Sequence, residues 1–403
     1  MTKPPLLMLV HRIPYPPNKG DKIRSFNLMK QLSQDYAIHL GCFVDDNFDL
    51  QYIDKLSQWC QSTQVINQNK WQAKLVGLSG FLTNKPITLP YYFSLNMQRW
   101  VNETLRQYNI SDVFIYSSSM AQYVEQAHLS SLNRIIDFVD IDSDKWRQYA
   151  SKKHGIKRWF YQREARLLQQ YEQYICTNFS KSLFVSNDEA QAFRQLMPPA
   201  LASKIHSLLN GVDTEYFKPD PNLTAAEGNL PQQFIVFTGA MDYWANIDAV
   251  IWFCQHVWPS IIAEQPQLHF VIVGGNPSNE VKSLARISGV SVTGRVVDVR
   301  PYIQHAVYAI APMLIARGIQ NKVLEAMAMN KAVICTAMAM EGINAPDSTG
   351  VVIADSAEDF KLACLSQLQQ PKLQHSRQWI LNHFTWPNTL KKLLDLFAQE
   401  HSK

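Results

Sequence analysis

The fold of this chain is decided by residues 317–329, which read Arg317-Gly318-Ile319-Gln320-Asn321-Lys322-Val323-Leu324-Glu325-Ala326-Met327-Ala328-Met329. A short apolar run at 308–312 precedes this stretch, and another at 332–336 follows it. The polar start and the apolar spacing after it predict a loop that opens an amphipathic helix between two strands. Such a unit belongs to a parallel sheet, and ligands bind at the carboxyl ends of the strands in open α/β sheets.

The side chains of this stretch suit a phosphorylated ligand. Arg317 and Lys322 offer positive charge, and the helix start around Gly318 and Asn321 offers backbone N–H groups for phosphate oxygens. One helical turn further on, the Glu325 carboxylate can accept hydrogen bonds from two vicinal hydroxyls, as a ribose presents them. We therefore expect a nucleotide-binding loop here.

The same stretch resembles the nucleotide-sugar-binding segment of the glycosyltransferase family 4-like enzymes, which have the GT-B fold. Those enzymes typically carry two glutamates separated by seven residues, followed by Ala-Met-Ala. Glu325 and residues 326–328 match the second half, whereas the first glutamate is replaced by Arg317. In the family that glutamate contacts the transferred sugar, so we expect Arg317 to meet a phosphate or an acidic sugar instead.

The resemblance implies two Rossmann-like, doubly wound α/β domains that face each other across a cleft. It also implies metal-independent transfer, with retention at the anomeric carbon, from a UDP- or GDP-sugar and without a cofactor. The Arg-Gly-Ile-Gln-Asn-Lys form is most similar to bacterial sugar transferases associated with exosortase (PEP-CTERM) and exopolysaccharide systems. The expected acceptor is a glycan or a polyprenyl-diphosphate-linked glycan.

Length and element order also indicate two domains. A chain of 403 residues is long for one core, and strand-like and helix-like segments alternate in both halves. We expect an acceptor-binding domain over 1–205, a nucleotide-sugar-binding domain over 206–385, and a helix over 386–403 that crosses back to the first domain. The expected strands lie near residues 6–11, 38–44, 113–116, 134–138, 182–186, 234–238, 270–274, 290–293, 308–311, 332–335 and 350–353.

Three further loops at strand ends are candidate donor-binding segments. The first holds Gly20, where the family places backbone against the donor diphosphate; the alternative is an ordinary turn. The second holds Gly239, Tyr243 and Asn246, where many relatives carry an arginine and a lysine; the alternative for Tyr243 is packing between domains. The third holds Arg295, which lines the nucleotide pocket in this interpretation and is a solvated loop charge in the alternative.

Four carboxylates follow the expected strand at 134–138, within Asp137-Phe138-Val139-Asp140-Ile141-Asp142-Ser143-Asp144. In the family the equivalent loop faces the acceptor, often with a histidine, but position 139 is Val. Asp140 or Asp142 is therefore our candidate for positioning or deprotonating an acceptor hydroxyl. The alternative is that Asp142 or Ser143 caps a helix. No histidine lies nearby at metal-ligand spacing, so we expect no metal site.

Residues 145–172 are strongly basic, with eight Lys or Arg against two Glu and with aromatic residues among them. Such a helix can lie on an anionic membrane; a solvated face or an acceptor-phosphate site is the alternative. A net charge of +4 and the lack of a recognisable binding motif argue against nucleic acid. The short apolar N-terminal run, the absence of a membrane-length run and the unpaired cysteine spacing predict a cytoplasmic protein, with peripheral contact at the inner face of the plasma membrane as an option.

Transfer of a sugar is thus the leading hypothesis. The missing first glutamate leaves two other hypotheses open. One is a GT-B module that binds sugar nucleotides without transferring the sugar, and the other is a GT-B sugar-nucleotide epimerase.

Overall fold

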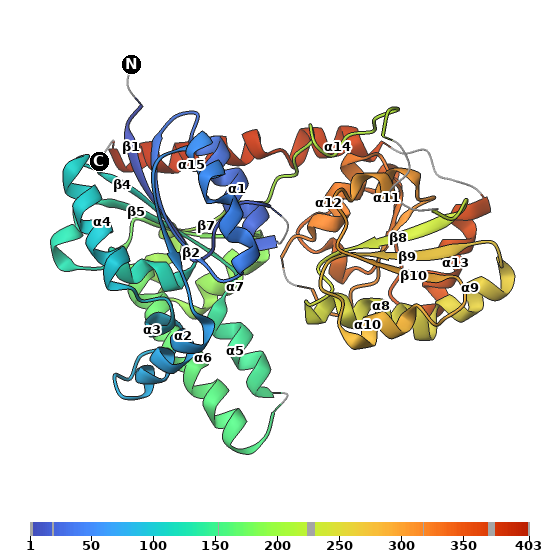
Figure 1. Cartoon of the computed structure of the whole chain (residues 1–403), viewed down its shortest axis with the longest axis horizontal. Coiled ribbons are helices and arrows are strands. Elements are labelled where there is room, and N and C mark those ends of the chain that lie inside the picture. Colours follow the sequence, from blue (N-terminus) through green and yellow to red (C-terminus); the bar gives the residue numbers. More distant parts are fainter. Residues whose placement is uncertain are drawn as a thin grey trace. The chain divides into compact units, whose positions relative to one another are not determined.

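The computed structural model describes residues 3–17, 20–151, 153–223, 230–316, 318–369 and 375–401. The chain forms two compact units (Figure 1). The first comprises Met1–Leu209 together with Thr389–Lys403, and the second comprises Asn210–Asn388. Each unit has its own parallel sheet.

The sheet of the first unit has the strand order β3-β2-β1-β4-β5-β6-β7, with all neighbours parallel. Its strands are β1 (Pro5–Val10), β2 (Ala37–Val44), β3 (Cys60–Asn67), β4 (Asp112–Tyr116), β5 (Asn133–Val139), β6 (Lys181–Phe184) and β7 (Ile205–Ser207). The central strands are apolar and almost fully buried, as expected where helices cover both faces. After β3 the chain crosses to the other side of β1 to form β4, so the strand order reverses between β1 and β4.

Helices connect these strands and cover the sheet. The α-helices of the first unit are α1 (Gly20–Leu32), α2 (Lys70–Gly77), α3 (Thr88–Tyr91), α4 (Leu95–Gln107), α5 (Asp142–Ser151), α6 (Gly155–Asn178) and α7 (Asn187–Leu196). The 3₁₀ segments are η1 (Asn47–Gln58), η2 (Leu78–Phe81), η3 (Ser118–Tyr123), η4 (Ala127–Leu129) and η5 (Pro199–Lys204). The last helix, α15 (Trp386–His401), contributes residues from Thr389 onward to this unit, where the Phe397 ring lies near those of Tyr36 and Phe114.

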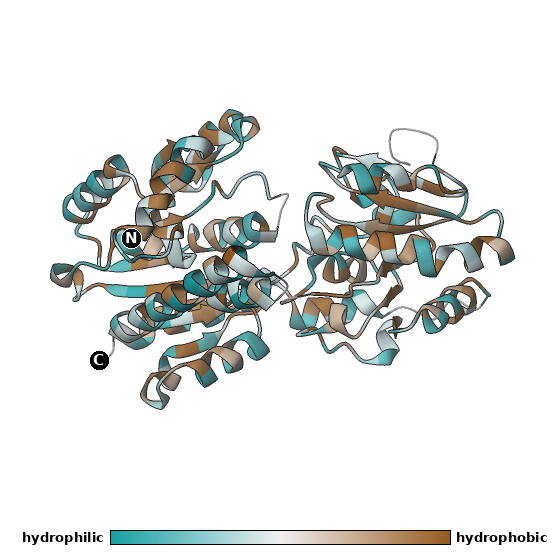
Figure 2. Cartoon of the chain, turned by 90° about the horizontal axis from the view of Figure 1, so that it is seen from below, coloured by the Kyte–Doolittle hydropathy of each residue, from teal (hydrophilic) through white to brown (hydrophobic). Residues whose placement is uncertain are grey.

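The sheet of the second unit has the order β10-β9-β8-β11-β12-β13, again all parallel. Its strands are β8 (Phe234–Thr238), β9 (His269–Val273), β10 (Val290–Gly294), β11 (Ala309–Ala311), β12 (Val333–Cys335) and β13 (Val351–Ile353). Hydrophobic residues run along the central strands of this unit (Figure 2). Here the strand order reverses between β8 and β11.

The helices of the second unit are α8 (Trp244–His256), α9 (Trp258–Glu264), α10 (Asn279–Leu284), α11 (Arg300–His305), α12 (Asn321–Ala328), α13 (Ala357–Gln369) and α14 (Ser376–His383), with the 3₁₀ turns η6 (Met338–Met340) and η7 (Asp347–Thr349). All six cysteines of the chain are buried and unpaired. Among the described residues, every helix is too short or too polar to span a bilayer. The predicted α/β class and the parallel sheet in each half are confirmed.

Candidate functional site

The reversal of strand order in the second unit marks where a ligand is expected to bind. In open α/β sheets the loops after the two strands that flank such a reversal diverge, and they leave a crevice at the carboxyl edge. The flanking strands here are β8 and β11. Their loops lead into α8 and α12 respectively, so the starts of these two helices border the candidate site.

A hydrogen-bonded cluster joins the two helix starts. Lys322, in the first turn of α12, donates from Nζ to Asn246 Oδ1 at 3.0 Å and to Gln320 Oε1 at 3.3 Å. Asn246, in the first turn of α8, donates in turn from Nδ2 to the Ala240 carbonyl at 2.9 Å. The ammonium also lies 5.2 Å from the centroid of the Phe237 ring. The structure therefore brings together Lys322 and Asn246, and it fixes the ammonium at the reversal point.

Burial perturbs the two charged groups of α12. Burial lowers the pKa of Lys322 to about 8, although the nearby Glu325 carboxylate opposes this shift. Burial likewise raises the pKa of Glu325 to about 7, against the opposing charge of Lys322. Paired groups with displaced pKa values are typical of functional sites, because structural packing alone favours neutral residues there. Both side chains are only partly buried, so a ligand can reach them.

Among the described residues, none donates a hydrogen bond to the Glu325 carboxylate, so its oxygens can accept hydrogen bonds from ligand hydroxyls. Gly318 adopts a left-handed φ of 62° ahead of the helix. Asn321 accepts through Oδ1 from Asn210 Nδ2 at 3.2 Å, so its side chain also ties the start of α12 to the segment before β8. Arg317 lies outside the described residues.

Close contacts join the loops after β8, β9 and β10. Gly239 N donates to the Val273 carbonyl at 3.0 Å. A Cβ placed on Gly274 would lie 1.7 Å from the Gly239 oxygen, so only glycine allows this approach. The stem of Arg295 lies against Gly275, with Nε 3.6 Å from the position of an added Cβ. Tyr243, beside these loops, is half exposed. Sequence reasoning missed Gly274, although two glycines at a strand end were a usable signal.

In the first unit, Gly20 opens α1 at the corresponding reversal between β1 and β4, and an added Cβ there would meet nothing within 4 Å. The next residue, Asp21, accepts from Arg12 Nη1 at 2.8 Å. Burial would raise the pKa of Asp21, but the neighbouring His11 and Arg12 outweigh it and hold that pKa well below its usual range. Asp21 is therefore a charged anchor for the start of α1.

Asp140 and Asp142 lie at the carboxyl end of β5, near the same reversal. Asp140 pairs with Lys145 Nζ at 2.9 Å, and Asp142 accepts from Ser118 Oγ at 3.1 Å. The residue before them, Val139, has a φ of 70°, a conformation that β-branched residues rarely adopt. Such strain persists only where the surroundings impose it, and it is common at ligand-binding loops.

The start of α5 is capped by carboxylates from elsewhere in the first unit, not by Asp142 or Ser143. Glu172 accepts from Ser143 N at 2.9 Å and from Ser143 Oγ, and Glu189 accepts from Ile141 N at 3.2 Å. Burial raises the pKa of Glu172 to about 8, with the Ser143 hydrogen bonds opposing the rise. Sequence reasoning missed this buried glutamate, because nothing in the local pattern distinguishes it from a surface residue of a basic helix.

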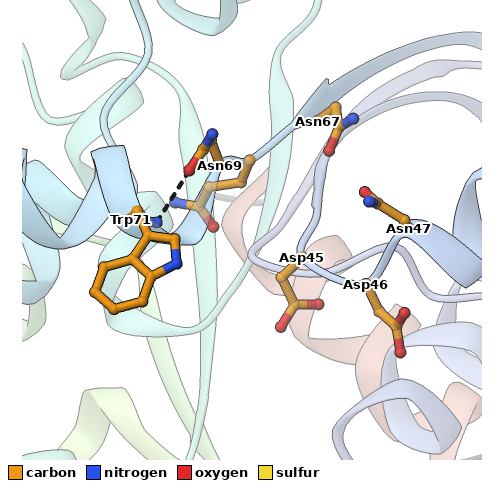
Figure 3. A pocket seen from close by; sticks show the side chains of 7 residues that line it. Asp45, Asp46, Asn47, Asn67, Asn69 and Trp71 are labelled. Atoms are coloured by element: carbon orange, nitrogen blue, oxygen red, sulfur yellow. Dashed lines mark hydrogen bonds between the residues drawn. The ribbon is translucent and has the colours of Figure 1, made fainter.

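A pocket of about 630 Å³ opens at the carboxyl ends of β2 and β3 in the first unit (Figure 3). Its lining is polar apart from one indole, and comprises Asp45, Asp46, Asn47, Asn67, Gln68, Asn69 and Trp71. Arg12 donates to Asp45 Oδ2 at 3.1 Å, which connects this lining to the loop after β1. Across the described residues, no three His, Cys, Asp or Glu side chains form a group that could hold a metal ion.

Comparison with known proteins identifies the second unit. Residues 232–370 match the model of the family described as "Glycosyl transferases group 1". The second unit is a glycosyltransferase group 1 domain. The matched residues contain the whole cluster around Lys322, together with the loops after β8, β9 and β10.

Other proteins are similar to this chain over most of its length. A protein of Klebsiella pneumoniae, described as an uncharacterized 44.6 kDa protein in cps region, is 22% identical over 357 residues and covers 85% of both chains. Sucrose-phosphate synthase of Thermosynechococcus elongatus superposes with a TM-score of 0.71 at 15% identity, over 99% of this chain and 100% of its own. Anabaena HepE, solved in complex with UDP and glucose, gives 0.66 at 14% identity, over 98% and 99%. The glycosyltransferase domain thus belongs to a chain with the GT-B fold.

Proposed function

We propose that this glycosyltransferase takes its sugar from a nucleoside-diphosphate sugar bound at the start of α12. The observation that carries the proposal is the cluster of Lys322, Asn246 and Glu325 at the strand reversal of a glycosyltransferase group 1 domain. The match of the fold to HepE, whose structure holds UDP and glucose, supports a nucleotide-sugar donor. UDP- and GDP-sugars are the donors proposed.

On the donor side, Glu325 would accept hydrogen bonds from the ribose hydroxyls. Lys322 and Arg317 would neutralise the diphosphate, assisted by the N–H groups at Gly318 and Asn321. Asn246 would hold the Lys322 ammonium in place through its 3.0 Å hydrogen bond. We propose that the other predicted loop residues also contact the donor; they are Gly20, Gly239, Tyr243 and Arg295.

The chemical step we propose is metal-independent transfer with retention. The bond between the anomeric carbon and the β-phosphate oxygen breaks, and the nucleoside diphosphate leaves with the electron pair. The acceptor oxygen bonds to the same carbon on the same face, and its proton passes to Asp140, to Asp142 or to the leaving phosphate. Fixed positive charge at the diphosphate stabilises the charge that develops as the bond breaks.

For the acceptor we propose a glycan, free or carried on a polyprenyl diphosphate, in exopolysaccharide synthesis. The cps-region relative supports a polysaccharide product. The pocket of Figure 3 would hold an acceptor sugar, because carboxylates and amides bind hydroxyls and an indole offers an apolar plane to a sugar ring. A lipid-linked acceptor would bring the enzyme to the inner face of the plasma membrane through basic residues of 145–172. The link to exosortase systems stays a prediction.

The test is release of nucleoside diphosphate by the purified protein from a panel of UDP- and GDP-sugars, with lipid-linked and free glycans as acceptors. We expect acceptor-dependent release from one donor, unchanged by EDTA, with a product that keeps the donor's anomeric configuration by NMR. Release that does not depend on any acceptor, or interconversion of the donor sugar, would contradict transfer.

A further inference from the structure

The segment formed by α2 and η2 in the first unit turns its large apolar side chains to solvent. Trp71, Leu75, Leu78 and Leu82 are 78%, 70%, 55% and 90% exposed. Their spacing of four, three and four residues places them along one face of a helical segment. Isolated exposed apolar residues are ordinary, but a continuous row of four along one helical face is not.

The opposite face of this segment consists of its smallest residues. Ala73, Gly77 and Gly80 are buried, and a Cβ on Gly80 would lie 2.8 Å from the Lys85 carbonyl oxygen. An ordinary surface helix buries its large apolar residues and exposes polar ones. This segment does the reverse, because close packing through small residues leaves the large ones outside. The segment therefore leaves an apolar surface open to solvent.

The beginning of α6 extends this apolar face. The Phe81 ring stacks with that of Trp159 at 6.4 Å, and Arg163 Nη2 donates to the Gly80 carbonyl at 2.7 Å, so the two segments are held side by side. Ile156 and Trp159 are themselves exposed. The apolar face therefore comprises Trp71, Leu75, Val76, Leu78, Phe81, Leu82, Ile156 and Trp159.

Only positive charge lies along the two segments that carry this face. Residues 55–102 and residues 145–163 contain no Asp or Glu. Of the cations in 145–172, Lys145, Arg147 and Arg163 are ion-paired within the unit. Lys74, Lys85, Lys153, Lys157 and Arg158 are exposed cations close in sequence to the apolar face.

We propose that the apolar face inserts into the interfacial layer of an anionic lipid bilayer, while these cations bind the headgroups. A basic helical surface with an apolar face binds anionic membranes in two ways: the apolar side chains are buried in the bilayer, and the cations are attracted to the anionic headgroups. A symmetric dimer through the same face would place these cations against the same cations of the second copy, and the like charges would repel. Trp71 also lines the pocket of Figure 3, so the docked surface adjoins the proposed acceptor-sugar site. The inference does not depend on the donor-site assignment.

The test is co-sedimentation of the full chain with vesicles of phosphatidylcholine alone or mixed with phosphatidylglycerol. We expect binding to the mixed vesicles, reduced about tenfold or more by Leu75→Ser with Leu82→Ser. Leu362→Ser is the matched control, because Leu362 is 55% exposed on α13 of the second unit and should not change binding. Lys157→Glu with Arg158→Glu should lower binding only to the anionic vesicles. Circular dichroism and thermal unfolding confirm that each variant is folded.

Failure of the wild-type chain to bind either vesicle would overturn the proposal. So would equal binding by the Leu75/Leu82 double variant. A concentration-dependent dimer in light scattering that this double variant abolishes would assign the apolar face to a second copy instead. Acceptor-dependent release of nucleoside diphosphate with a free glycan and no added membrane, measured in parallel, separates failure of docking from failure of the transferase assignment.

Discussion

Replacing Lys322 with Met should abolish most turnover without destabilising the protein. The change removes the charge and keeps the length of the side chain. If the ammonium stabilises the leaving diphosphate, turnover should fall by about two to three orders of magnitude, the usual effect of deleting one preorganised donor to developing charge.

The effect on stability follows from burial. Burial lowers the pKa of Lys322 from 10.5 to about 8, and this corresponds to about 3 kcal/mol against the charged form. Because the folded pKa lies below the unfolded one, the charged lysine costs stability at pH 7, and Met removes that cost. Loss of the hydrogen bond to Asn246 Oδ1 offsets about 1–3 kcal/mol of this gain. The free energy of unfolding should therefore stay equal or rise by roughly 1 kcal/mol.

The assay pairs steady-state kinetics with urea unfolding at pH 7, and Lys331→Met is the matched control. Burial lowers the pKa of Lys331 as well, and its Nζ donates to the Ala306 carbonyl at 2.8 Å. It precedes β12, however, and so lies at the opposite edge of the sheet from the proposed site. Turnover within about threefold of wild type in Lys322→Met, or an equal loss in Lys331→Met, would refute the reasoning.

Four further predictions concern binding, the pH profile and stability. Glu325→Gln should weaken nucleotide binding by about 10- to 100-fold, and the variant should bind the 2′-deoxy nucleotide about as well as the ribonucleotide; a retained preference for the ribonucleotide in calorimetry would exclude the ribose contact. The pKa of Glu325 is raised to about 7 and that of Lys322 is lowered to about 8. The value of kcat/KM should therefore fall below about pH 7, as the carboxylate protonates, and above about pH 8, as the ammonium deprotonates. The Lys322→Met variant should lack the fall at alkaline pH. The pKa of Glu172 is raised to about 8 in the folded state, so the folded protein binds this proton more tightly than the unfolded chain does. The free energy of unfolding should therefore fall as pH rises from about 5 to 9, and Glu172→Gln should flatten that slope in denaturant titrations. An unchanged slope would argue against a buried neutral acid. Gly274→Ala should cost about 3 kcal/mol or more, since its Cβ would lie 1.7 Å from the Gly239 oxygen, and a variant as stable as wild type would contradict that packing.

All the central strands of both sheets were predicted, because their residues are largely buried on both faces. The run at β1 and the run at β8 each read as continuous apolar segments, and the structure places strands there to within a residue or two. The strand β3 was missed because it lies at the sheet edge and reads Cys-Gln-Ser-Thr-Gln-Val-Ile-Asn, with most side chains only partly buried. A polar edge strand carries little of the pattern that sequence reasoning uses.

The site was predictable in its residue types but not in its contacts. The positions of Lys322 and Glu325 after a strand indicated a phosphate and ribose site by themselves. The hydrogen bond from Lys322 to Asn246 joins residues 76 positions apart, and it exists because β8 and β11 are neighbours in the sheet. The local sequence does not show that β8 and β11 are neighbours in the sheet. The exposed row on α2 was missed for a related reason, since the amino-acid pattern of an outward apolar face is the same as that of a buried one.

The central claim is that a nucleoside diphosphate binds at the start of α12. The most direct measurement is thermal unfolding of the purified chain with UDP, GDP and ADP and their common sugars, for wild type, Glu325→Ala and Lys331→Met. The account predicts stabilisation by one nucleotide and its sugar, lost in Glu325→Ala and retained in Lys331→Met. Stabilisation by none of them, or stabilisation that survives in Glu325→Ala, would contradict it.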